Sequence, residues 1–329
     1  MTHNNTILDI VDVKKHYAVK RSFLSTRNKE IVRAVDGVSL GIRKGETLGL
    51  VGESGCGKST LGICVMGLQE TSSGSILFGE GNDKKDIKDM TDSERFAYSE
   101  KVQIVFQDPY SSLNPQKTIF TALDEPMQVH GIKSRQERLD KIAHLLESVN
   151  LQADYMYRYP HEFSGGQRQR ICIARSLSVD PIMLVCDEPV SALDVSIQAQ
   201  VLNLLMDLQK KLGLAYLFIA HDLSVVHHMS DRIAVMYLGK VVELAESSEL
   251  HEHPCHPYTR ALFSAIPSPD IDYHAERMIL KGDIPSPANI PSGCRFHTRC
   301  PECKEICSRE EPSLIDIDGH LAACHNITR

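Results

Sequence analysis

The sequence lacks both an excess of positive charge and a long apolar run, and each absence excludes a class of protein. The net charge is −7 at pH 7 and the pI is near 6.1, which argues against broad nucleic-acid binding because that function usually needs a basic face. No stretch approaches the roughly 20 uninterrupted apolar residues that cross a bilayer, and the first residues lack a basic-then-apolar export signal. We therefore expect a cytoplasmic chain that binds no nucleic acid.

An internal repeat is also missing, although 329 residues leave room for one large α/β domain and an appendage. Hydrophobic residues make up 42% of the chain, which is enough for a sizeable core. Each motif described below occurs once, which excludes two tandem copies of one domain in this chain.

A glycine-rich segment follows the apolar run 47–51 and precedes the apolar-periodic stretch 61–68, as expected for a strand, a loop and a helix start. It matches the template Gly-x4-Gly-Lys-Ser/Thr and reads Gly52, Glu53, Ser54, Gly55, Cys56, Gly57, Lys58, Ser59, Thr60. Glycines let consecutive N–H groups face an anion, and the helix N-terminus adds about half a positive charge. The segment predicts a phosphate-binding loop, with Lys58 on the β- and γ-phosphates and Ser59 on Mg²⁺.

Two carboxylates stand together at the end of the apolar run 182–186, namely Asp187 and Glu188. A buried strand would deliver them at its carboxyl end, where open α/β sheets bind ligands. An acidic pair alone is more often a solvated loop, but a phosphate loop in the same chain disfavours that interpretation. We expect Asp187 to hold magnesium and Glu188 to polarise the water that attacks the γ-phosphate.

A second helix start follows Ser164, where Ile171, Ala174 and Leu177 are spaced to face inward. Ser164 is the expected N-cap of this helix, and Gly165, Gly166 and Gln167 follow it. Taken alone, the segment would be a flexible loop before an ordinary helix.

Together these motifs resemble those of the ATP-binding subunits of ABC transporters, and the resemblance spans most of the chain. It implies a P-loop NTPase, RecA-like α/β core with an antiparallel β subdomain, a helical insertion and a Cys-rich C-terminal appendage. The segment from Ser164 to Gln167 resembles the family signature, with Phe163 where leucine is commoner. Because this change leaves the backbone donors intact, we expect it to be harmless.

The resemblance implies roles for four more residues. Gln107 resembles the Q-loop glutamine that senses magnesium and the γ-phosphate, and Asp194 ends a segment that resembles the D-loop. His221 resembles the switch histidine on the γ-phosphate, which makes Gln107, Glu188 and His221 the expected catalytic set. Tyr17 would stack on adenine, although an aromatic residue in an N-terminal strand is more often part of the core.

In this family the signature and the phosphate loop of one subunit are too far apart to grip the same phosphate. Two subunits are therefore expected to pair head to tail with ATP at the interface. Loss of the γ-phosphate on hydrolysis removes contacts that favour the closed state, and the dimer opens.

Three segments resemble bacterial dipeptide and oligopeptide importers in particular, namely residues 105–115, 160–163 and 256–262. Residues 14–17 and 55–57 resemble the second ATPase of the pair, the DppF/OppF type. The implied partners are a related ATPase in a heterodimer, two membrane permease subunits and, indirectly, an extracytoplasmic peptide-binding protein. The implied location is the cytoplasmic face of the bacterial inner membrane.

Ten cysteines in a cytoplasmic chain should be mostly reduced, and Cys64, Cys172 and Cys186 fall in apolar patterns typical of a core. Five others crowd into the last segment: Cys294, Cys300, Cys303, Cys307 and Cys324. A short stretch without its own core is a candidate for a metal staple.

The resemblance to peptide-importer ATPases implies a [4Fe-4S] cluster on Cys294, Cys300, Cys307 and Cys324. Cys303 is the competing ligand, because it forms a Cys-x2-Cys pair with Cys300 that also suits Zn²⁺. A tail with no metal is the third alternative.

A separate group of His251, His253, Cys255 and His256 could bind metal on paper, but neighbouring proline favours a solvated linker, and we assign no site there.

We expect a nucleotide-binding domain over 1–250, with a helical subdomain at about 107–164, and a C-terminal extension over 251–329. The charged stretch 81–100 is an expected surface insertion. Two other functions stay open, a soluble ABC ATPase without a transport role and a regulatory module that senses metal or redox state.

Overall fold

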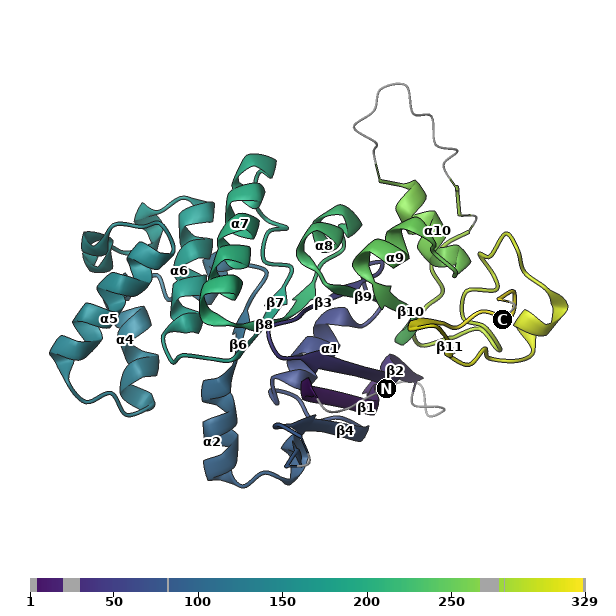
Figure 1. Ribbon diagram of the computed structural model, residues 1–329, viewed down its shortest axis with the longest axis horizontal. Coiled ribbons are helices and arrows are strands. Elements are labelled where there is room, and N and C mark those ends of the chain that lie inside the picture. The colour runs from purple at the N-terminus through teal and green to yellow at the C-terminus, as the bar shows by residue number, and fades with distance from the viewer. Residues whose placement is uncertain (1–4, 20–29, 82, 267–277, 281, 328–329) are drawn as a thin grey trace, which may run out of the picture. The chain divides into compact units, whose positions relative to one another are not determined.

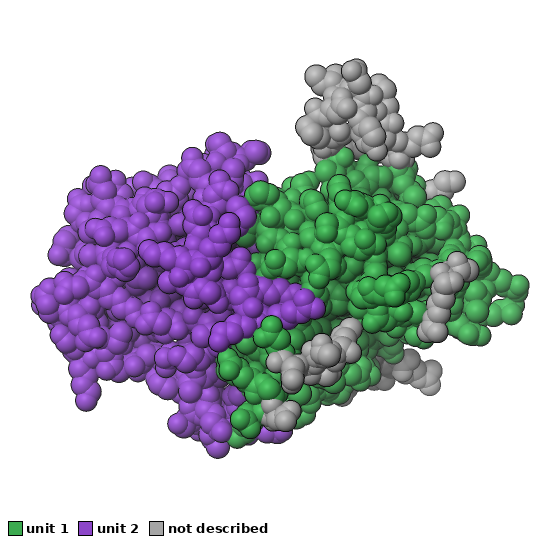
Figure 2. All heavy atoms as spheres, in the orientation of Figure 1, with its two compact units in different colours: residues 1–42, 47–88, 219–329 green, residues 43–46, 89–218 purple. Residues whose placement is uncertain are grey.

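The structure is a computed structural model that describes residues 5–19, 30–81, 83–266, 278–280 and 282–327. The chain divides into two compact units, which Figure 2 shows in different colours. Unit 1 takes its residues from 1–42, 47–88 and 219–329, and unit 2 takes them from 43–46 and 89–218. Figure 1 labels the elements of both units.

An antiparallel sheet forms the first layer of unit 1, with the order β2-β1-β4-β5. Its strands are β1 (Thr6–Val19), β2 (Glu30–Arg43), β4 (Ser73–Phe78) and β5 (Lys85–Asp86). Leu8 pairs with Phe78 and Ile10 with Ile76, and the four consecutive residues from Ile7 to Ile10 are all buried. The antiparallel portion predicted from 31–42 and 75–78 is confirmed, and β1 lies between these two strands.

The second sheet of unit 1 carries the element that leads into the phosphate loop. Its order is β11-β12-β10-β9-β3, and only the β3/β9 pair in it is parallel. The strands are β3 (Thr47–Val51), β9 (Arg232–Tyr237), β10 (Lys240–Glu246), β11 (Ile315–Ile317) and β12 (His320–Ala322). All five residues of β3 are buried, as expected for a strand covered on both faces.

Helices cover this sheet and continue into the extension. They are α1 (Lys58–Val65), η2 (Ile87–Asp89), α8 (Leu223–Met229), α9 (Ser247–Glu252), α10 (Pro257–Ser264) and η5 (Glu305–Ser308). Helix α8 packs on β3 at Gly49, where an added Cβ would lie 2.3 Å from Val226 Cγ1.

The solvated linker predicted around His251 and His256 is wrong at His256, whereas His251 and His253 are exposed. His256 is 1% exposed, and its ring accepts the Tyr258 N–H at 3.1 Å as the N-cap of α10. His251 stacks on His227, with 4.6 Å between ring centroids. Proline at the first helical position stabilises a helix start rather than a loop, which is why the prolines misled the prediction.

A buried carboxylate joins β10 to α10 and β12. Glu243 is fully buried, and it accepts the backbone N–H groups of Cys255 at 2.6 Å and His256 at 3.0 Å. His320 Nε2 lies 2.7 Å from the same carboxylate, whose hydrogen bond raises the pKa of His320. The extension is therefore tied to the central sheet by polar contacts as well as by strand pairing.

Unit 2 contains a parallel sheet with the order β8-β7-β6 and a helical arm. The strands are β6 (Val102–Val105), β7 (Met183–Asp187) and β8 (Ala215–Ile219). The helices are α2 (Asp92–Lys101), α3 (Pro109–Ser112), α4 (Ile119–Val129), α5 (Arg135–Ser148), η3 (Ala153–Tyr157), η4 (Pro160–Glu162), α6 (Gly165–Leu177) and α7 (Val195–Leu212).

The two helical patterns predicted between Gln107 and Ser164 are confirmed as α4 and α5, which lie side by side (Figure 1). A buried ion pair between Arg138 and Asp124 joins them. The stretch 81–100 is more ordered than predicted, because α2 begins in a capping box between Thr91 and Glu94.

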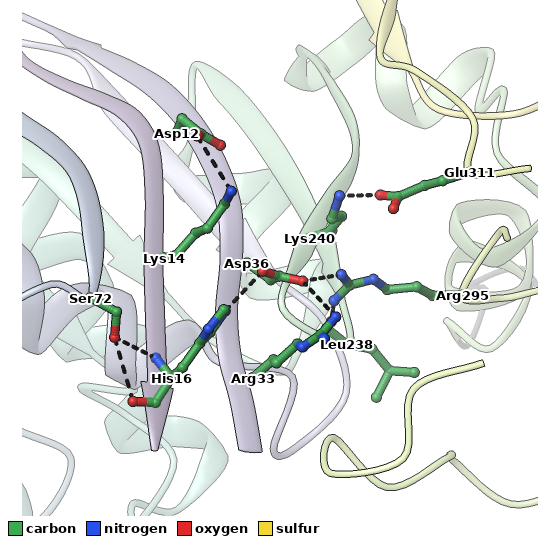
Figure 3. A network of polar contacts seen from close by, with 10 residues as sticks. All are labelled: Asp12, Lys14, His16, Arg33, Asp36, Ser72, Leu238, Lys240, Arg295 and Glu311. Carbon is green, nitrogen blue, oxygen red and sulfur yellow. Dashed lines mark hydrogen bonds and ion pairs between the residues drawn. The ribbon is translucent and has the colours of Figure 1, made fainter. Parts of the chain in front are cut away.

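A second buried ion pair anchors the extension on β2. Arg295 donates to the Asp36 carboxylate and to the Leu238 carbonyl, and His16 Nε2 lies 2.8 Å from the other Asp36 oxygen (Figure 3). Burial alone would raise the pKa of Asp36, but hydrogen bonds from Arg295 and His16 hold that pKa below its usual value of 3.8. The pair therefore stabilises the fold above the unfolded pKa of Asp36, and this stabilisation is lost as the pH falls through the folded pKa.

We predict that Asp36→Asn lowers the free energy of unfolding by about 3 kcal/mol at pH 7, because Arg295 is left buried without its counter-charge. Denaturant titrations at several pH values should show the difference from wild type beginning to shrink below about pH 4, where Asp36 of the unfolded chain takes up a proton, and shrinking until the pH falls below the lowered pKa of the folded state.

The control for this variant is Asp12→Asn, since Asp12 is exposed and lies 3.6 Å from Lys14 in the same region (Figure 3). This exposed pair should contribute less than about 1 kcal/mol. Equal losses in the two variants would contradict the anchoring role of Asp36.

Candidate functional site

The predicted phosphate loop of unit 1 depends on glycines in the left-handed region. Gly52, Gly55 and Gly57 have φ angles of 153°, 78° and 107°. An added Cβ would lie 2.1 Å from the Met236 carbonyl oxygen at Gly52, and 1.9 Å from the Ala34 carbonyl oxygen at Gly57. Only glycine permits both this backbone conformation and this close approach to β2 and β9.

Lys58 lies inside the loop, and its residue is 4% exposed. Its ammonium donates to the carbonyl oxygens of Gly52 at 2.7 Å and Glu53 at 3.2 Å. Cys56 packs beside it as a small buried side chain, and burial raises the pKa of this thiol. Ser54 and Gly55 are exposed, and Ser59 and Thr60 are half-buried at the start of α1. The loop therefore places a cation among backbone groups, as phosphate binding requires.

Two other predicted nucleotide residues belong to unit 1. His221 is exposed two residues after the end of β8, and the next residue, Asp222, caps α8 by accepting the Ser224 N–H at 2.8 Å. Tyr17 is half-buried on β1 and donates its hydroxyl to Gln69 Oε1 at 2.6 Å. Stacking of Tyr17 on adenine stays a prediction.

The predicted carboxylates stand at the end of β7 in unit 2. Asp187 is the last residue of the strand and is 8% exposed. Glu188 follows with a φ of 47°, which is uncommon for a residue with a side chain. The Gln107 amide donates to the Glu188 carboxylate at 3.0 Å, so the structure brings these two predicted catalytic residues together. Such backbone strain is typical of functional sites, where neighbouring contacts hold a side chain in place.

The helix start at Ser164 is confirmed in detail. Ser164 Oγ accepts the Gln167 N–H at 3.3 Å, and Gln167 Oε1 accepts the Ser164 N–H at 3.0 Å, which forms a capping box. The residues predicted to face inward, Ile171, Ala174 and Leu177, are at most 3% exposed.

Close packing also explains the second signature glycine. A Cβ on Gly166 would lie 2.4 Å from Ile197 Cγ2 of α7, whereas Gly165 has ordinary contacts. Asp194 precedes α7 as its N-cap residue but makes no capping hydrogen bond with its side chain. The carbonyls of Val190 and Leu193 accept from the Gln198 amide at 3.1 and 3.0 Å, which holds the predicted D-loop.

The tail cysteines gather in unit 1. Burial raises the pKa of Cys294 to about 11, and Cys307, Cys324 and Cys300 are close enough to add to this rise. Backbone N–H groups donate to sulfur at 3.4 Å in two places, from Lys304 to Cys307 Sγ and from Asn326 to Cys324 Sγ. Cys303 is exposed.

In the described residues, no three tail sulfurs lie as close together as the ligands of one tetrahedral Zn²⁺. Four thiolates on one tetrahedral Zn²⁺ would lie about 3.8 Å apart, from a Zn–S bond of about 2.3 Å. Among the residues that the structure describes, the one group of three or more candidate ligands within 4.8 Å is Glu243, Cys255 and His320. Because Glu243 already accepts three hydrogen bonds, this group is accounted for by the contact between the extension and the sheet.

The core cysteines are placed as predicted, since Cys64, Cys172 and Cys186 are at most 2% exposed. Two residues of the extension that contact the phosphate loop, Tyr258 and Arg299, were not among the predicted site residues. Both lie more than 200 positions from Glu53, and no local pattern links such distant residues.

Comparison with known proteins shows that two families match different regions of the chain. The family described as "ABC transporter" matches residues 35–191, and the family described as "Oligopeptide/dipeptide transporter, C-terminal region" matches residues 242–307. The oligopeptide transport ATP-binding protein AppF of Bacillus subtilis is 50% identical and covers 98% of both chains. The dipeptide transport ATP-binding protein DppF of Haemophilus influenzae is 47% identical with the same coverage.

Solved structures agree on the fold. CbiO1 of Clostridium perfringens, part of an ABC transporter complex, has a TM-score of 0.64 and 26% identity, covering 76% of this chain and 92% of that one. The dimeric ATP-binding cassette MJ0796 with bound ADP and phosphate has a TM-score of 0.63 and 27% identity, covering 73% and 98%. Across the part of the chain that the structure describes, none of the helices has the length and apolar character that a bilayer span requires.

We predict that Gly57→Ala weakens binding of Mg-ATP by roughly tenfold or more, because the methyl group would push the loop away from the Ala34 carbonyl. Calorimetric titration of the full-length protein measures this change.

Gly131→Ala is the matched control, since Gly131 has a φ of 92° but nothing within 4 Å of an added Cβ. It carries the backbone strain without the clash and should bind Mg-ATP as the wild type does. A similar loss of affinity in both variants would show that the close approach at Gly57 is not required.

Proposed function

Because the chain belongs to the ATP-binding proteins of ABC transporters, in the group that carries the oligopeptide/dipeptide C-terminal region, we propose that it hydrolyses ATP to drive peptide uptake. The cargo would be dipeptides or oligopeptides, as the names of the relatives indicate. Membrane permease subunits would provide the pathway.

The observation that carries the ATPase assignment is the contact between Gln107 and Glu188 at the end of β7. We assign Glu188 as the residue that polarises the attacking water and Gln107 as the residue that holds its carboxylate ready. Asp187 and Ser59 would hold Mg²⁺, whose charge neutralises the phosphates during transfer. Lys58 would bind the β- and γ-phosphates and His221 the γ-phosphate.

A head-to-tail dimer is part of this proposal. The helix start of Ser164 to Gln167, together with the Asp194 segment, would act on the ATP held by the phosphate loop of a partner. The preferred partner is a second, related ATPase. Two permease subunits would bring both ATPases to the cytoplasmic face of the bacterial inner membrane. The division into a nucleotide-binding domain, 1–250, and an extension, 251–329, belongs to the same proposal.

The test of the catalytic assignment is Glu188→Gln. Loss of the general base should slow ATP hydrolysis by about a hundredfold or more, whereas Mg-ATP binding should persist and the closed dimer should accumulate. Phosphate release and size-exclusion chromatography with ATP measure the two effects.

Glu147→Gln on α5 is the control, because Glu147 is exposed on the helical arm. It should hydrolyse ATP at the wild-type rate. Near-normal turnover in Glu188→Gln would remove the assignment of the base.

We also propose that the tail holds a [4Fe-4S] cluster on Cys294, Cys300, Cys307 and Cys324. Two observations support this site: the thiols lie near one another, and backbone N–H groups donate to two of the sulfurs. A bound cluster would supply a covalent staple for a segment with few strands. Zn²⁺ remains the alternative, with Cys303 as a ligand.

The ligand set predicts opposite outcomes for two neighbouring cysteines. Anaerobically purified Cys300→Ser should lose the brown colour and most of its iron and acid-labile sulfide, whereas Cys303→Ser should keep them. Elemental analysis and absorption spectra measure both. A colourless wild-type protein that contains stoichiometric zinc would overturn the cluster.

A further inference from the structure

The extension contacts the phosphate loop at Glu53 and holds this residue by two different groups. Arg299 Nη1 and Nη2 donate to the two carboxylate oxygens of Glu53 at 2.7 and 3.2 Å. The Tyr258 hydroxyl accepts the Glu53 backbone N–H at 2.9 Å. Both contacts lie within unit 1, and both come from residues after 250.

The backbone carbonyl of Glu53 faces the interior of the loop. Its carbonyl oxygen accepts from the Lys58 ammonium at 3.2 Å and from the Cys56 N–H at 3.3 Å. The peptide units on both sides of Glu53 therefore set the curvature of the loop and the position of Lys58. Any rotation of Glu53 would move the carbonyl that holds this ammonium.

Arg299 is itself held rigidly. Its side chain is 8% exposed, and its backbone N–H donates to the Phe296 carbonyl at 3.0 Å. The Phe296 ring packs on Tyr237 and Tyr258 with centroid distances of 5.3 and 5.4 Å, and all three rings are fully buried. A planar guanidinium fixed in this way can impose an orientation on a carboxylate, because the fork geometry allows one arrangement of two bonds.

We propose that Arg299 is a positioning residue for the phosphate loop, and that through it the C-terminal extension sets the affinity of the site for ATP. The proposal rests on the proposed function, since it needs the loop to bind ATP. The positive charge of Arg299 is already matched by the Glu53 carboxylate, so Arg299 acts on the loop and not on the phosphates.

One substitution, Glu53→Gln, separates this role from direct phosphate binding. If Arg299 contacted the phosphates, Glu53→Gln would release its charge and strengthen nucleotide binding. If Arg299 positions the loop, Glu53→Gln removes the carboxylate that Arg299 holds, so the affinity for nucleotide should fall. The two models predict changes of opposite sign.

The experiment measures binding of AMP-PNP with Mg²⁺ to the full-length chain by calorimetry. We expect Arg299→Ala and Glu53→Gln each to raise Kd about five- to tenfold. The double variant should bind AMP-PNP no more weakly than the weaker-binding single variant, because both substitutions remove the same interaction. Arg299→Lys should recover only part of the affinity, since an ammonium cannot make the forked contact. In ATP hydrolysis by the assembly of this chain with its permeases, we expect the KM of Arg299→Ala to rise. Its kcat should stay within about twofold of the wild-type value.

The control is Arg260→Ala, which removes another forked arginine pair in the same extension. Arg260 binds Glu302 through two contacts of 2.8 Å and does not contact the phosphate loop. Arg260→Ala should leave the Kd for AMP-PNP unchanged. Its thermal unfolding is compared with that of Arg299→Ala.

Three results would overturn the inference: an unchanged Kd in Arg299→Ala, an equal rise in Arg260→Ala, or tighter binding in Glu53→Gln. Wild-type protein that binds no AMP-PNP would refute the proposed function itself, and the positioning role with it. The two failures are thereby distinguishable.

Discussion

The close approach of the phosphate loop to its neighbouring backbone is the constraint on which the rest of unit 1 depends. Gly52 and Gly57 place the loop against the carbonyls of Met236 and Ala34, at distances that no Cβ could occupy. This contact joins the end of β3 to β9 and β2, and a glycine loop of this kind can turn consecutive N–H groups toward an anion. An anion site of this kind needs no net positive charge, which explains how a chain of charge −7 can bind triphosphate.

The side chains proposed for hydrolysis are found in both compact units. Unit 1 holds the phosphate loop and His221, and unit 2 holds Gln107, Asp187, Glu188 and the helix start at Ser164. Within unit 2, the hydrogen bond from Gln107 holds the carboxylate of Glu188, whose φ is positive, at the end of β7.

The C-terminal extension is an integral part of unit 1. Strand β12 pairs with β10, Glu243 binds the turn before α10, and Arg295 is buried against Asp36. Each contact satisfies a group that would otherwise be buried without a partner, at a cost of several kcal/mol for a charge. The extension thus contributes to the stability of the nucleotide-binding sheet, and the cysteines lie next to the arginines that make the contacts.

Short-range patterns were sufficient to predict the local elements: the strand before the phosphate loop, the helix capped by Ser164 and the two helices of the arm. These follow from apolar periodicity and capping, which act over a few residues. The buried cap at His256, the ordered helix α2 and the binding of Glu53 by Arg299 became apparent in the folded chain alone. Contacts between residues hundreds of positions apart depend on where the packed elements bring their side chains, and no short-range pattern records that.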